Sequence, residues 1–240
     1  MQSQRRDRKP ILVIEHASFV HLAALRAVLE KSGLPFWEIR PYRGDVFPAL
    51  SEISGVLSLG GPMGANDEAE HSWIPTELSF LKQAVEAKIP TIGICLGAQM
   101  MAKALGSSVE RADQAEVGWH PLNLSEEGRR DPLFKDLEGS PTQVYQWHQD
   151  TFFLPPGATL LASSPLCPRQ AFRIGMHAYG VQFHPEADPA LIEEWLNQPD
   201  DSLAPTSDEE RRAHLENTQV GLTTHARLLS KFIEFFDNAS

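Results

Sequence analysis

The chain has 240 residues, of which 42% are hydrophobic and 22% charged, so it can bury a sizeable core within a single α/β domain. Its net charge of −11 disfavours nucleic acids and anionic membranes as partners, because both attract positively charged surfaces. Cysteine is sparse, at two residues, and no apolar run approaches the ~20 residues of a membrane span. The composition therefore predicts a cytoplasmic protein.

Short apolar runs alternate with helical patterns over the first two-thirds of the chain. The runs at 11–14, 36–39, 55–59 and 91–94 are predicted to be buried strands. Helical spacing predicts helices after the first run, from about Pro75, and after Cys95. This alternation is typical of a parallel sheet that helices cover on both faces.

The second half of the chain has a different pattern. Segments at 143–147, 159–162 and 180–183 are short and strand-like, which predicts antiparallel additions at the sheet edge. A last helix that carries Leu228, Leu229, Phe232 and Phe236 should pack back on the sheet.

Two polar segments are predicted to lie outside the packed core. Residues 1–10, with a basic run before the first strand, are interpreted as a disordered tail ahead of one domain at 11–240. Residues 198–210 are acidic and contain two prolines, which predicts a mobile surface loop.

The segment GICLG at 93–97 has features of a nucleophile elbow. Glycines flank Cys95 two residues away on each side and permit a sharp strand-to-helix turn. A cysteine at a helix N-terminus is favoured as the reactive thiolate. A buried structural cysteine remains the alternative for this segment alone. Cys167 has no such glycines and is predicted to be structural or incidental.

The segment HPE at 184–186 follows a predicted strand and so should lie at its carboxyl end, where open α/β sheets bind ligands. His184 could take the thiol proton and return it to a leaving amine. Glu186 could orient the imidazole. A solvated histidine beside an unrelated acid is the alternative for these residues.

The glycines after the third predicted strand could form part of an oxyanion hole. Gly60 and Gly61 permit a turn whose backbone N–H groups face outward. The N–H of Leu96, which follows Cys95, would be the second donor. If Cys95 were absent, the Gly60–Gly61 segment would be interpreted as an ordinary loop.

Together these segments resemble the class I glutamine amidotransferase domain over about residues 11–186, and in particular free-standing proteins similar to the GMP synthase amidotransferase domain. The motif GICLGAQ at 93–99 and the motif GVQFHPE at 180–186 carry the resemblance. It implies that Cys95 is the nucleophile, His184 the base and Glu186 the residue that orients it. It also implies an oxyanion hole at Gly61 and Leu96, and glutamine contacts from Gln99, His148, Gln149 and Asp150. Gln149 departs from the family pattern, which usually has glycine there.

The resemblance implies a flavodoxin-like three-layer α/β sandwich, mostly parallel, with an antiparallel extension. It implies cysteine-dependent hydrolysis of a γ-glutamyl amide through a thioester, with release of ammonia or an amine. A stand-alone γ-glutamyl peptidase and a non-catalytic regulatory protein on the same scaffold remain alternatives. The expected partners are a small γ-glutamyl substrate and a separate synthetase or ligase. No cofactor is expected, and the acidic cluster at 67–71 is interpreted as a solvated loop and not as a metal site.

Overall fold

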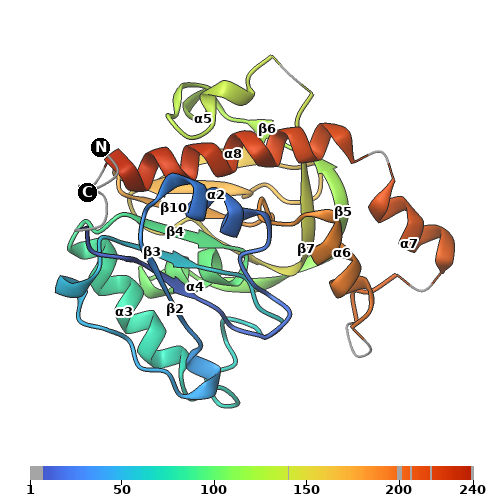
Figure 1. Ribbon diagram of the computed structural model, residues 1–240. Coiled ribbons are helices and arrows are strands. Elements are labelled where there is room, and N and C mark those ends of the chain that lie inside the picture. The colour runs from blue at the N-terminus through green and yellow to red at the C-terminus, as the bar shows by residue number, and fades with distance from the viewer. Residues whose placement is uncertain (1–7, 140, 199–201, 206, 217, 239–240) are drawn as a thin grey trace.

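The computed structural model describes residues 8–139, 141–198, 202–205, 207–216 and 218–238. An eight-stranded sheet forms the centre of this structure (Figure 1). Its strand order is β2-β1-β3-β4-β10-β9-β8-β6, and a separate two-stranded sheet pairs β5 with β7. The strands are β1 (Ile11–Ile14), β2 (Phe36–Ile39), β3 (Gly55–Ser58), β4 (Thr91–Ile94), β5 (Val109–Pro121), β6 (Asn123–Leu124), β7 (Gln143–Phe152), β8 (Ala158–Ser163), β9 (Ala171–Ile174) and β10 (Ala178–Val181). The helices are α2 (Ala24–Ser32), α3 (Ile74–Glu86), α4 (Leu96–Ala104), α5 (Glu126–Arg130), α6 (Pro189–Leu196), α7 (Asp208–Leu215) and α8 (Gln219–Asn238).

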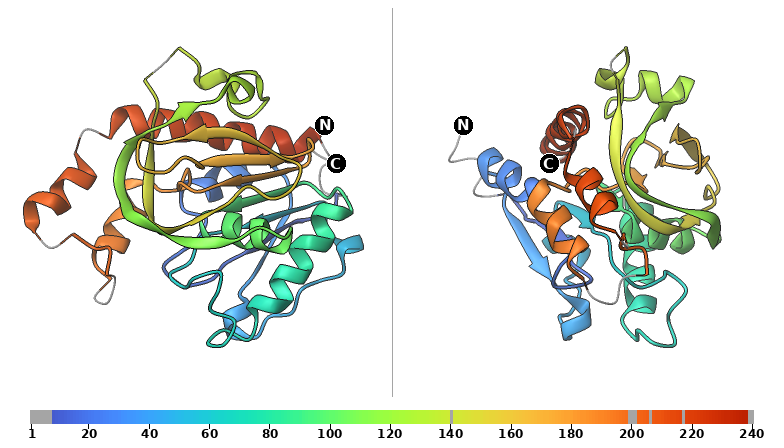
Figure 2. Two further views of the ribbon diagram at one scale, coloured as in Figure 1. Left: turned by 180° about the vertical axis from the view of Figure 1, so that it is seen from behind. Right: turned by 90° about the vertical axis from the view of Figure 1, so that its right-hand side faces the viewer.

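The inner parallel strands β1, β3, β4 and β10 are buried on both faces, whereas the edge strand β2 is only partly buried. In β1, Ile11 and Val13 pack with α2 and α8, whereas Leu12 and Ile14 pack with α3 and α4. Figure 2 shows these helices in separate layers on the two sides of the strands. A strand covered on both faces has no solvent side, which is why its sequence is continuously apolar. The prediction of a mostly parallel three-layer sandwich is confirmed.

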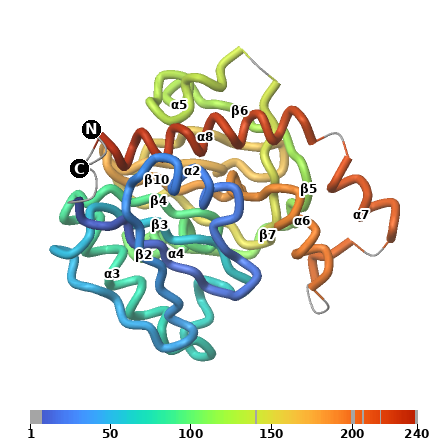
Figure 3. Tube along the Cα trace, viewed as in Figure 1, coloured from blue at the N-terminus to red at the C-terminus, as the bar shows by residue number. Residues whose placement is uncertain are grey.

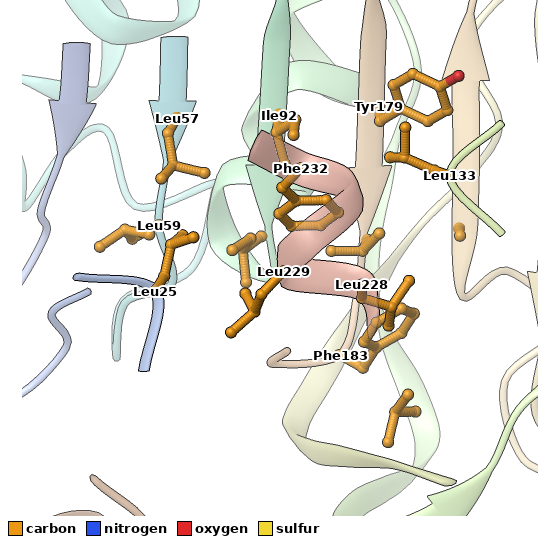
Figure 4. Close-up of a cluster of buried hydrophobic side chains, with 14 of the residues drawn as sticks. Leu25, Leu57, Leu59, Ile92, Leu133, Tyr179, Phe183, Leu228, Leu229 and Phe232 are labelled. Atoms are coloured by element: carbon orange, nitrogen blue, oxygen red, sulfur yellow. The ribbon is translucent and has the colours of Figure 1, made fainter. Parts of the chain in front are cut away.

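Helix α8 closes one face of the sheet, as its apolar spacing predicted. Leu228, Leu229 and Phe232 are at most 2% exposed and pack against Leu57 and Ile92 of the sheet (Figure 4). Burial of this face is the main source of stability for such a helix. The C-terminal helix is therefore part of the core.

The antiparallel extension is confirmed for β9, β8 and β6, which follow β10 in the sheet. The prediction was wrong in placing the segment at 180–183 at the sheet edge, because β10 lies inside the sheet, parallel to β4 on one side and antiparallel to β9 on the other. Figure 3 shows the β10 trace beside that of β4. The prediction was also wrong in placing the segment at 143–147 at the sheet edge, because β7 pairs with β5 in the second sheet. Succession along the chain cannot distinguish a strand that returns to the sheet centre from one that adds to its edge.

The two predicted polar segments both include residues that the structure describes. Residues 1–7 lie outside the described residues, but the Arg8 guanidinium pairs with Asp237 at 2.5 Å. In the predicted loop, residues 199–201 and 206 are not described, and α7 begins at Asp208. Ser207 caps this helix with Glu210 in a capping box, a sequence signal that predicts a helix start.

No helix within the described part of the chain is long and apolar enough to cross a membrane.

Candidate active site

The two sequence motifs meet at the carboxyl edge of the central sheet. Cys95 directly follows β4, and His184 and Glu186 come shortly after β10. The two strands are parallel neighbours, with Ile94 opposite Val181, and the Cys95 N–H donates to the Val181 carbonyl at 2.8 Å. Parallel strands bring their carboxyl ends to one edge, so residues far apart in sequence become neighbours there.

Cys95 occupies a sharp turn between β4 and α4. It is the N-cap residue of α4, with φ of 49° and ψ of −108°, a conformation that residues other than glycine seldom adopt. The turn is tight because Gly97 lacks a side chain: a Cβ there would lie 2.2 Å from the Ser58 carbonyl oxygen. The predicted elbow is therefore present, with Cys95 held in a strained backbone conformation.

His184 is fixed between Cys95 and Glu186. Its Nδ1–H donates to Glu186 Oε1 at 2.8 Å, and its ring is close enough to the Cys95 side chain for the two to interact electrostatically. Burial disfavours the charged ring, but the charges and hydrogen bonds of Glu186 and Cys95 outweigh it and raise the pKa of His184 to about 10. The structure thus brings together the three residues predicted as a triad, with an imidazolium that stays charged at neutral pH.

The Gly60–Gly61 turn lies against Cys95. A Cβ on Gly60 would be 3.6 Å from the Cys95 Cβ, and the Gly60 carbonyl accepts a hydrogen bond from His16 Nδ1 at 2.8 Å. All described peptide bonds are trans, so the Gly61 N–H points away from that carbonyl and from His16. Leu96 opens α4, where backbone N–H groups have no acceptor within the helix. Gly61 thus lines the cavity that opens at Cys95, and Leu96 follows Cys95 directly at the start of α4.

A buried ion pair supports this turn. His16 Nε2 lies 3.0 Å from both Glu77 carboxylate oxygens, and Ser58 donates to Glu77 Oε1 at 2.8 Å. Burial opposes charge on the ring, but Glu77 outweighs it and raises the pKa of His16 above its usual value. Both ring nitrogens can thus donate, one of them to Gly60. Sequence analysis missed His16, although it stands just after β1, at the strand end where ligands bind.

A cavity of about 470 Å³ opens beside Cys95. Gln99, His148, Gln149 and Asp150 all line it, so the structure gathers every residue predicted to contact the substrate. Gln99 Nε2 donates to the Asp150 carbonyl at 3.0 Å, and Gln149 Oε1 accepts from Arg111 at 2.6 Å. Sequence analysis missed Arg111, which reaches the cavity from β5.

A buried polar network holds the wall of this cavity. His148 contacts Glu116 at 3.2 Å and the Asp150 carbonyl at 3.0 Å. Glu116 also accepts hydrogen bonds from Ser164 and Gln170. Burial opposes its charge, but the hydrogen bonds from His148 and Ser164 lower the pKa of Glu116. Glu116 thus orients His148 from β5, a role that its sequence position alone did not indicate.

Cys167 and the acidic cluster at 67–71 are separate from this site. Cys167 is 3% exposed, and its Sγ lies 3.2 Å from the Thr151 hydroxyl. In the acidic cluster, Glu68 pairs with Lys103. Among the described residues, no group of three or more histidine, cysteine, aspartate or glutamate side chains could hold a metal ion.

A comparison with known protein families and structures agrees with a nucleophile elbow on an α/β sandwich. The family model for Glutamine amidotransferase class-I matches residues 25–197. The chain belongs to this family of enzymes, which hydrolyse or transfer the amide of glutamine.

Three similar proteins illustrate the relationship. The glutamine amidotransferase-like protein YfeJ of Salmonella typhimurium is 34% identical over 80% of this chain and 81% of its own length. A GMP synthase of Porphyromonas gingivalis is 36% identical over 63% of this chain, which spans only 28% of that enzyme. The crystal structure of a glutamine amidotransferase from Methylobacillus flagellatus superposes with a TM-score of 0.84 at 26% identity, covering 97% of this chain and 96% of that one.

Proposed function

We propose that this protein hydrolyses the side-chain amide of glutamine, or of a related γ-glutamyl compound, through a thioester on Cys95. The observation that supports this most is the arrangement of Cys95, His184 and Glu186 at one sheet edge, beside a cavity with polar walls. The intact set of reactive groups favours a catalytic protein over a regulatory one on the same scaffold.

In the proposed reaction the Cys95 sulfur attacks the amide carbon and a C–S bond forms. The N–H groups of Gly61 and Leu96 stabilise the negative charge on the carbonyl oxygen. His184 then gives its proton to the leaving nitrogen, the C–N bond breaks, and a γ-glutamyl thioester remains. Water, deprotonated by His184, hydrolyses the thioester to release glutamate and restore the thiol.

The proposal is tested by trapping the thiol and by measuring glutamate release. A chloroketone analogue of glutamine should alkylate Cys95, add one label per chain by mass spectrometry, and abolish activity. Cys95→Ala should remove both labelling and turnover. Cys167→Ala is the matched control, and it should keep activity within a few-fold of the wild type. Full activity in Cys95→Ala would contradict the proposal.

We also propose that the released ammonia passes to a separate synthetase or ligase subunit. The similarity to GMP synthases, which are named as glutamine-hydrolysing enzymes and are much longer than this chain, supports this partner class.

A further inference from the structure

A second, smaller cavity adjoins the first at Cys95, and the two share Phe19, Gly61, Pro62 and Trp147 as lining residues. Its volume is about 40 Å³, a few times the ~10–15 Å³ that one water molecule needs. Cys95 and His184 line its floor, and its walls include Phe19, Val20, Trp147 and Trp195. Of the two cavities that meet at Cys95, this small one is the one that His184 lines.

The two cavities can be assigned to the two halves of a γ-glutamyl amide. The glutamyl half carries an α-amino and an α-carboxylate group, which need polar partners when bound. The large cavity supplies these through Arg111, Gln99 and Asp150. The leaving nitrogen must lie next to His184, which protonates it. The substituent on that nitrogen therefore enters the small cavity.

The walls of the small cavity are apolar. The Trp195 N–H is not available to a ligand, because it donates to the Phe19 carbonyl at 2.7 Å. The Trp195 ring stands edge-on to the His184 ring, with 4.7 Å between the ring centroids. Val20 is 5% exposed. No lining residue other than Cys95 and His184 carries an ionisable side chain, and the nearby Glu194 is paired with His21 at 3.2 Å.

A negatively charged leaving group is disfavoured in this cavity. A carboxylate on the carbon next to the leaving nitrogen would lie against Phe19, Val20 and Trp195, whose side chains offer it no hydrogen bond. His184 cannot pair with it, because Nδ1 of the ring is bonded to Glu186 and the other ring nitrogen serves the leaving nitrogen. An alkyl group of the same shape needs no such partner.

We propose that this cavity selects the leaving group: ammonia and small uncharged apolar amines leave readily, whereas α-amino acids do not. The inference rests on the proposed function and narrows it, because it disfavours γ-glutamyl dipeptides as substrates. The chemistry is unchanged: the C–N bond breaks as the C–S bond forms, and the His184 proton goes to the amine.

The test compares leaving groups of matched shape on the wild-type protein. The substrates are glutamine, γ-glutamylisobutylamide, γ-glutamylglycinamide and γ-glutamylglycine, and glutamate release is measured for each. The isobutylamide should have a kcat/KM within about tenfold of that for glutamine. The glycine compound, similar in shape but charged, should be at least about 100-fold slower than the isobutylamide, with the glycinamide between them.

A pair of variants tests the electrostatic cause. Phe19→Lys adds a cation at the cavity wall, whereas Phe19→Met changes the wall without adding charge. The ratio of γ-glutamylglycine to isobutylamide kcat/KM should be at least about tenfold higher in Phe19→Lys than in Phe19→Met. If either variant fails to fold, the wild-type comparison still decides the question.

The outcomes separate this inference from the proposed function. If none of the four compounds releases glutamate and no thioester forms, the proposed function is wrong. If all four react and the kcat/KM for γ-glutamylglycine is within tenfold of that for the isobutylamide, only the assignment of the small cavity to the leaving group is overturned.

Discussion

At the scale of single residues, Glu186 determines how far into the alkaline range the His184 ring stays charged. The ring is charged in the folded protein up to a pKa of about 10, against about 6.5 in an unfolded chain. This pair therefore stabilises the fold fully below pH 6.5, and the contribution is lost as pH rises through 10. The stability difference between wild type and Glu186→Gln, measured by urea unfolding, should be largest at about pH 6 and shrink towards pH 10. A difference that grows with pH would contradict the assignment.

His184 and Glu186 should contribute unequally to kcat. His184 moves the proton, whereas Glu186 only orients and stabilises the ring. We expect His184→Ala to lower kcat by about 10³-fold or more, and Glu186→Gln to lower it less. Steady-state glutamate release measures both, and circular dichroism confirms that each variant is folded. Normal turnover in His184→Ala would mean that another residue is the base.

Gln149 is predicted to restrict the substrate cavity. Its side chain lines the cavity and is tied to Arg111, so it occupies space and engages a cation that could bind the substrate carboxylate. Gln149→Gly should raise kcat/KM for glutamine by a few-fold to about a hundredfold, the range of ~1–3 kcal/mol that changes in pocket contacts give. Arg111→Gln in the same background should remove much of that gain. No change for glutamine or any γ-glutamyl amide would make Gln149 a bystander.

At the same scale, the sequence identified the reactive residues and Glu186, which orients His184, but not the residues that shape the substrate cavity. Cys95 and His184 stand in motifs with a mechanism. Glu116 and Arg111 gain their roles only because β5 lies beside β7, a pairing between residues far apart in the chain. Such contacts leave no local pattern, so they could not be predicted without the fold.

At the scale of elements, the His16–Glu77 pair should position the oxyanion loop between β3 and α3. A variant with both His16→Leu and Glu77→Gln removes the hydrogen bond to Gly60 without leaving a buried carboxylate unpaired. We expect a fall in kcat of about 10- to 100-fold with KM nearly unchanged, below the 10²–10³ of a lost oxyanion donor. The single variant Glu77→Gln keeps His16 as a donor to Gly60, so its kcat should fall much less.

A second measurement separates positioning from damage to the fold. Alkylation of Cys95 by iodoacetamide forms no oxyanion, so its rate should be unchanged in the double variant. If alkylation slows as much as kcat falls, the pair supports the fold in general and the positioning role is wrong.

Elements with a regular pattern were predicted well. The strands at 11–14, 36–39 and 91–94 have the predicted bounds, and α2 ends at Ser32, one residue before Gly33, whose φ is 71°. Strand β5 was missed because only three of its thirteen residues are buried and its register shifts between Arg111 and Glu116, which breaks the alternation of polar and apolar residues. An irregular strand on a two-stranded sheet has no periodic signal to read.

At the scale of the whole molecule, the large cavity should limit hydrolysis of free glutamine. Its volume of about 470 Å³ falls in the ~300–1,000 Å³ range of sites for larger ligands, so a single amino acid leaves water around the reacting groups. The protein alone should hydrolyse glutamine slowly. A synthetase partner that closes the cavity should raise the rate at least about tenfold, or ~1.4 kcal/mol.

The activation is measured as the rate of glutamate release with and without a synthetase encoded next to the gene for this protein. An unrelated protein of similar charge serves as the control. Fast, saturable hydrolysis of glutamine by the chain alone would show that no partner is needed.

The position of β10 in the sheet also affects when activity can arise during folding. Strands β1 to β4 pair among themselves and end at Ile94, whereas β10 reaches β4 only after the chain has passed through β5 to β9. Pairings between distant segments form late, because long loops must close first. Cys95 is therefore synthesised well before His184, and we expect β1 to β4 to pair before His184 arrives beside it. A nascent or partly refolded chain would carry an inactive thiol, and the first appearance of glutamate release would mark the moment at which the sheet is complete.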